Sequence, residues 1–85
     1  MRLVELSPRW VVKEGRRVGV SFLCPHCKDD RLHVFFANPA DGGPPAGHPA
    51  WDRTGASFDE MTLRPSLDAS SSGHWHGFLT RGEVS

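Results

Sequence analysis

The 85-residue sequence has no net charge and no long run of apolar residues. A membrane-spanning helix needs about 20 consecutive apolar residues, so we expect no membrane span. Lys and Arg total 10, and Asp and Glu also total 10. This balance gives no overall electrostatic attraction to nucleic acid or to an anionic membrane.

The first residues also lack the pattern of a secretory signal. Glu5 places a charge, and Pro8 a break, where such a signal has an uninterrupted apolar stretch. We therefore expect the protein in the cytoplasm of the host cell. In that compartment a structural disulfide between the two cysteines is disfavoured.

The sequence shows no window of 11 or more residues with the apolar spacing of an amphipathic helix. It has instead short segments rich in β-branched and aromatic residues, separated by polar or glycine-containing turns. These segments are residues 10–12, 18–23, 32–36, 51–53, 61–67, 74–79 and 83–84. The pattern predicts one all-β domain over residues 1–85, an antiparallel β sandwich or an open barrel of hairpins with little or no helix.

The longest break in this pattern is residues 37–50, which contain four prolines and three glycines. So many backbone breakers exclude a helix or a central strand. We expect a flexible surface loop, which tolerates shortening because closure entropy changes slowly with loop length.

Cysteine and histidine gather in two other segments. A domain of this size buries only about 60% of its unfolded surface, so a further stabilising device is expected. Cys24 and Cys27 lie at the tip of a predicted hairpin, where a zinc knuckle forms. His74 and His76 are two residues apart in a predicted strand, so they project to one face. We predict one structural Zn²⁺ held by these four residues, with His33 as an alternative to either late histidine.

A redox role for the Cys24-Pro25-His26-Cys27 motif is the main alternative to zinc. Thiol-disulfide oxidoreductases carry such a motif at a helix N-terminus within a βαβ unit. Here charged residues and then a predicted strand follow the motif. The sequence therefore favours metal binding over redox catalysis.

The chain resembles a group of small phage- and prophage-encoded proteins of unknown function, some of which carry the name ammonia monooxygenase. The residues that carry the resemblance are FLCPxC at 22–27, LH at 32–33, TLxPSL at 62–67, HWHGFL at 74–79 and GEV at 82–84. The resemblance covers nearly the whole chain, and it implies that Cys24, Cys27 and His76, together with His74, bind a metal. The monooxygenase name does not fit, because that chemistry needs copper sites and membrane-spanning helices.

These observations lead to a functional hypothesis with alternatives. We expect a zinc-stabilised adaptor module that binds a host or phage protein. A different class is a zinc-dependent hydrolase, with water in one coordination position and Asp59 or Glu60 as general base. A nucleic-acid-binding zinc hairpin is a further alternative, because residues 1–28 contain six Lys or Arg against two Glu.

Overall fold

A computed structural model describes residues 1–47, 49–68 and 75–85. The described residues form one short 3-10 helix and seven strands. These are η1 (Leu3–Leu6), β1 (Arg9–Lys13), β2 (Arg16–Leu23), β3 (Arg31–Phe36), β4 (Ala50–Thr54), β5 (Thr62–Asp68), β6 (His76–Thr80) and β7 (Glu83–Val84). The prediction of an all-β fold with little helix is confirmed. Within the described ranges, no helix has the length and apolar character needed to cross a membrane.

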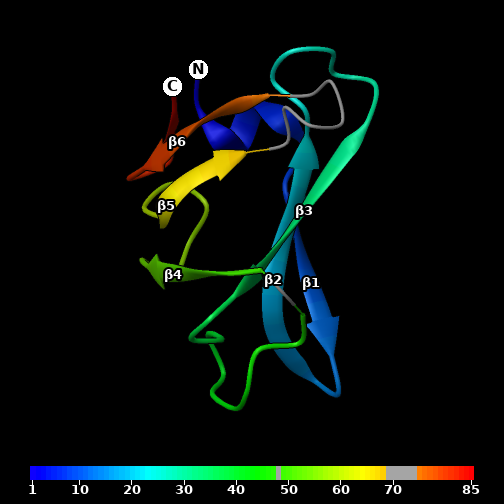
Figure 1. Ribbon diagram of the computed structural model, residues 1–85, viewed down its shortest axis with the longest axis vertical. Coiled ribbons are helices and arrows are strands. Elements are labelled where there is room, and N and C mark those ends of the chain that lie inside the picture. The colour runs from blue at the N-terminus through cyan, green and yellow to red at the C-terminus, as the bar shows by residue number, and fades with distance from the viewer. Residues whose placement is uncertain (48, 69–74) are drawn as a thin grey trace.

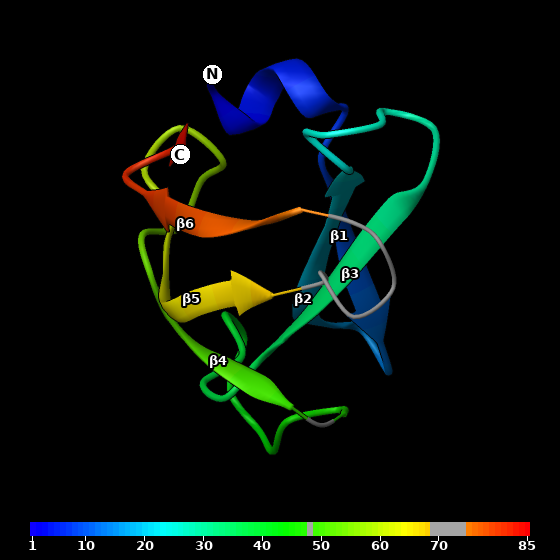
Figure 2. The same ribbon diagram turned by 45° about the horizontal axis from the view of Figure 1, so that its top comes forward.

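The strands form one sheet in which each strand pairs with its neighbour in sequence. The sheet curls into a half-barrel, with β1, β2 and β3 in one wall and β5 and β6 in the other (Figures 1 and 2). All pairs are antiparallel except β3 and β4, which pair in parallel at Phe35–Ala50 and Phe36–Trp51. A parallel pair needs a crossover connection of a dozen or more residues. The proline-rich segment between β3 and β4 supplies that crossover.

Apolar side chains from both walls and from η1 fill the inside of the half-barrel. Strand β6 illustrates the alternation that produces this core: Gly77 and Leu79 are buried, whereas His76, Phe78 and Thr80 face solvent. Burying one large apolar side chain contributes about 1.5–3 kcal/mol. The core consists of Leu3, Leu6, Val20, Phe22, Val34, Phe36, Met61, Leu63, Leu67, Leu79 and Val84.

The register between β5 and β6 contains a wide bulge. Leu63 pairs with Leu79, and Leu67 pairs with Gly77, so residues 64–66 stand opposite the single residue Phe78. Pro65 lies inside this bulge and has no N–H to donate to the ladder. A bulge redirects side chains, and bulges are over-represented next to active sites.

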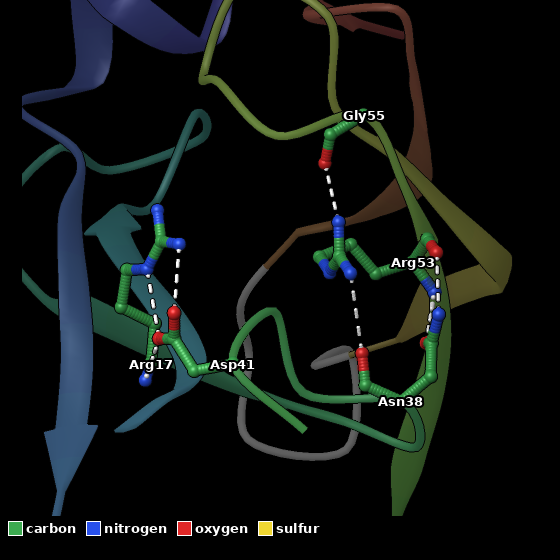
Figure 3. A network of polar contacts seen from close by, with 5 residues as sticks. All are labelled: Arg17, Asn38, Asp41, Arg53 and Gly55. Carbon is green, nitrogen blue, oxygen red and sulfur yellow. Dashed lines mark hydrogen bonds and ion pairs between the residues drawn. The ribbon is translucent and has the colours of Figure 1, made fainter. Parts of the chain in front are cut away.

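The segment between β3 and β4 is tied to the sheet by side-chain hydrogen bonds (Figure 3). The Asp41 carboxylate accepts hydrogen bonds from the Arg17 backbone N–H at 2.8 Å and from the Arg17 side chain at 2.9 and 3.0 Å. The Asn38 side chain accepts from the Arg53 backbone N–H and donates to the Arg53 carbonyl, each at 2.8 Å. Flexibility of residues 37–50 stays a prediction, and these contacts locate the part of the segment that shortening must spare.

Replacing Asp41 with Asn is expected to change how acid destabilises the fold. Hydrogen bonds from the Arg17 side chain and backbone lower the pKa of the Asp41 carboxyl to about 2. The unfolded value is about 3.9, so the carboxylate stabilises the fold above about pH 4, and this contribution is lost as the pH falls toward 2. Urea denaturation at pH values from 7 to 2 gives the free energy of unfolding at each pH. As the pH falls, this free energy should decrease less for Asp41→Asn than for the wild type.

The control for this experiment is Asp29→Asn, which removes an exposed carboxylate elsewhere on the surface. It should leave the acid dependence of the unfolding midpoint unchanged. An Asp41→Asn variant that loses stability as steeply as the wild type would contradict the role given to the Arg17–Asp41 pair.

Candidate functional site

Ser66 and His76 meet on the outer face of the half-barrel. Ser66 lies in the bulge of β5, and His76 is the first residue of β6. The Nε2 atom of His76 is 3.4 Å from the Oγ atom of Ser66. A serine hydroxyl beside an imidazole is the arrangement of a nucleophile and its general base, and the contact is often longer in the absence of substrate.

The backbone of Ser66 is held from the neighbouring strand. The indole Nε1–H of Trp51, on β4, donates a hydrogen bond to the Ser66 carbonyl at 3.1 Å. Trp51 is half-buried and packs against the core. The pairs Leu67–Gly77 and Asp68–His76 set Ser66 diagonally across from His76, and Trp51 holds the Ser66 backbone there.

His76 is positioned by the two residues that flank it. The Trp75 ring packs edge-to-face against Phe22, with ring centroids 6.2 Å apart. Gly77 lies against the Trp75 ring and the Ser85 carbonyl, where an added Cβ would clash with both. Because the neighbours of His76 are anchored toward the inside, alternation directs His76 outward to Ser66.

Asp68 supplies a carboxylate beside this pair. It is the direct cross-strand partner of His76, so the two side chains share one face of the sheet. A carboxylate next to a histidine stabilises the imidazolium that forms when the histidine accepts a proton. The face therefore presents a serine, a histidine and an aspartate within two adjacent strands.

A groove opens beside Ser66. Its volume is about 610 Å³, within the range of ligand-binding clefts. Besides Ser66, its lining includes Asp52, Leu63, Arg64, Pro65 and Phe78. A molecule in this groove would therefore lie next to the Ser66 hydroxyl.

Cys24 and Cys27 come together in the turn after β2. Cys24 is fully buried, and its carbonyl accepts a hydrogen bond from the Lys28 N–H at 2.8 Å. Burial raises the pKa of the Cys24 thiol, but hydrogen bonds from the backbone N–H groups of Cys27, His26 and Trp75 outweigh it. Together with a bond from the Cys27 side chain, they lower the pKa to about 7. The Trp75 contact links this turn to the residue before His76.

The structure places the predicted metal ligands as follows. Cys24 and Cys27 are adjacent, His76 contacts Ser66, and His33 is exposed on β3. His74 lies outside the described residues. Within the described part of the chain, no group of three or more His, Cys, Asp or Glu side chains is arranged to hold a metal ion. A zinc site at Cys24, Cys27, His74 and His76 stays a prediction. Zinc binding by His76 is an alternative to its contact with Ser66 as a base, because a zinc-bound imidazole has no free nitrogen to accept a proton.

A protein-family model described as "Bacterial ubiquitination-like system serine protease (BubE)" matches residues 3–85. The chain belongs to the BubE family. No curated protein and no solved structure matches it. The family name identifies a bacterial system, and a phage origin for this chain stays a prediction.

The BubE assignment overturns the function inferred from the sequence. The zinc adaptor hypothesis and its alternatives, the zinc hydrolase and the nucleic-acid-binding hairpin, are wrong, because the family is described as a serine protease. The hypothesis treated His76 only as a metal ligand and gave Ser66 no role. The two residues are ten apart in sequence, and their contact depends on the β5–β6 register and its bulge. The Pro-Ser-Leu string alone carries no nucleophile motif that would have revealed it.

Metal analysis tests zinc binding at Cys24 and Cys27, which is separate from the role of His76. We expect about one zinc per chain in protein purified without chelators, and loss of that zinc in Cys24→Ser and in Cys27→Ser, because thiolates are strong zinc ligands. Ser66→Ala is the control and should keep its zinc. Inductively coupled plasma mass spectrometry gives the metal content, and a zinc-free, fully reduced wild type would refute the prediction.

Proposed function

We propose that this BubE-family protein is a serine peptidase in which Ser66 is the nucleophile and His76 is the general base. Its substrate is a protein of a bacterial ubiquitination-like system. The observation that carries the proposal is the 3.4 Å contact between His76 Nε2 and Ser66 Oγ. The family description supports it, because it names a serine protease of such a system.

The proposed reaction follows from the chemistry of the pair. His76 Nε2 accepts the proton of the Ser66 hydroxyl as Oγ attacks the carbonyl carbon of the scissile peptide bond. The protonated His76 then gives this proton to the leaving amine, and an acyl ester remains on Ser66. Water, deprotonated by His76, hydrolyses the ester and regenerates the Ser66 hydroxyl.

Asp68 has a supporting role in this proposal. The imidazolium of His76 carries a positive charge in both tetrahedral intermediates, and the Asp68 carboxylate is its cross-strand partner. A carboxylate in this position stabilises the imidazolium electrostatically and does not itself accept the proton.

The setting of the pair supports a macromolecular substrate. Ser66 opens onto a groove on the outer face of the sheet, and its neighbours Arg64, Pro65 and Phe78 are exposed. An extended segment of a partner protein reaches such a groove without any opening of the fold. Protein partners also fit a component of a ubiquitination-like system.

Replacing Ser66 or His76 with Ala is expected to abolish the chemistry. Loss of either member of such a pair lowers turnover by at least about 10³-fold, because each depends on the other. Reaction with a fluorophosphonate, which phosphonylates activated serines, and intact-protein mass spectrometry provide a readout that needs no known substrate. Wild type should gain one phosphonyl group on Ser66, and both variants should react far more slowly.

Ser57→Ala and His26→Ala are the matched controls, since both residues are exposed and lie outside the pair. They should react within about twofold of the wild type, as surface substitutions away from special features change little. A Ser66→Ala variant that is phosphonylated as fast as the wild type would place the nucleophile elsewhere. A wild type that does not react at all would refute the peptidase proposal.

A further inference from the structure

Phe78 is a large apolar residue that the core does not use. Its side chain is 56% exposed, and it is absent from the packed core cluster. It lies two residues after His76 on β6, so both side chains project to the same face. It also lines the groove that contains Ser66. An exposed aromatic ring beside a nucleophile is positioned to contact whatever enters the groove.

The backbone of Phe78 is firmly held. Its N–H donates to the Ser85 carbonyl at 2.9 Å, and its carbonyl accepts from the Ser85 N–H at 3.0 Å. On the β5 side, Phe78 is the single residue of β6 that lies opposite residues 64–66, which include Ser66. The main chain of Phe78 is therefore held opposite the bulged segment that contains Ser66.

The charged side chains of the groove attract neither anionic nor cationic ligands preferentially. Asp52 and Arg64 both line it, and they are direct partners across β4 and β5. The electrostatic potentials of two neighbouring opposite charges largely cancel at the position of a ligand side chain in the groove. The rest of the lining consists of Leu63 and Pro65, which are apolar, and of Thr62 and Thr80, which carry no charge. The groove thus complements an apolar group better than a charged one.

We propose, building on the peptidase function above, that this groove is the subsite for a large apolar side chain of the substrate polypeptide, next to the bond that Ser66 attacks. Phe78 is the residue that selects this side chain by packing against it. The occupant is an extended segment of a partner protein, because the groove is lined by Ser66, the contact of His76, and lies on the solvent-facing side of the sheet. Phe78 acts on specificity and takes no part in proton transfer.

The test uses peptidyl diphenyl phosphonates, which phosphonylate the serine of a peptidase after their side chain has occupied the adjacent subsite. Three probes differ only in that side chain: phenylalanine, lysine or aspartate. Wild type should react with the phenylalanine probe at least about tenfold faster than with the other two, the size of effect that an apolar pocket provides. In Phe78→Ala the ratio of phenylalanine to lysine rates should fall to near one.

Val12→Ala is the matched control, because Val12 is similarly exposed, at 59%, but lies on β1 away from the groove. It should keep the wild-type ratio. Circular dichroism confirms that each variant is folded, and the ratio of rates is independent of the fraction of active protein. Equal rates for the three probes on the wild type, or an unchanged ratio in Phe78→Ala, would overturn the inference.

The failure of the two proposals can be told apart with a small fluorophosphonate that carries no side chain. If it reacts at Ser66 while the three probes react equally, the peptidase proposal stands and the apolar subsite is refuted. If neither the small reagent nor the probes react with the wild type, the peptidase proposal fails, and the subsite inference falls with it.

Discussion

The register between β5 and β6 is the constraint on which the site depends. In a regular antiparallel pair, the ladder would set one residue of β5 opposite Phe78; here residues 64–66 share that position. Pro65 cannot donate to the ladder, so the bulge removes no available backbone hydrogen bond at that residue. The register that pairs Leu67 with Gly77 and Asp68 with His76 places Ser66 diagonally across from His76, where its hydroxyl meets the imidazole. A change of one residue in this register would separate them, because the side-chain period of a strand is two.

Two half-buried tryptophans, Trp51 on β4 and Trp75 just before β6, hold this arrangement. Trp51 donates to the Ser66 carbonyl, and Trp75 packs on Phe22 while its backbone N–H bonds to Cys24. Both tryptophans pack against the core, so the positions of Ser66 and His76 follow from packing inside the half-barrel. This is a feature expected of a precise site, whose functional side chains need support from a second layer of contacts. The Cys24–Cys27 turn belongs to this layer, whether or not it also binds zinc.

The fold gives the site an open setting. The two walls of the half-barrel bury their apolar residues against each other, so the outer face of β4, β5 and β6 is free to carry polar groups such as Ser66 and His76. The crossover between β3 and β4 runs at the other wall, where Asp41 binds Arg17 (Figure 3). Among the described residues, the groove lies on the solvent-facing side of the sheet.

The sequence by itself determined the all-β class, the strand segments and the meeting of Cys24 with Cys27. These are local properties: β-branched and aromatic runs, turn residues, and two cysteines three positions apart. It did not determine the parallel β3–β4 pair, the η1 helix or the Ser66–His76 contact. Each of these depends on which strands become neighbours and in what register, which is decided by burying one shared core. The alternation of a strand sets the outward direction of His76 in either interpretation. Only the tertiary structure brought Ser66 next to it, because the register between β5 and β6 is a property of two strands together.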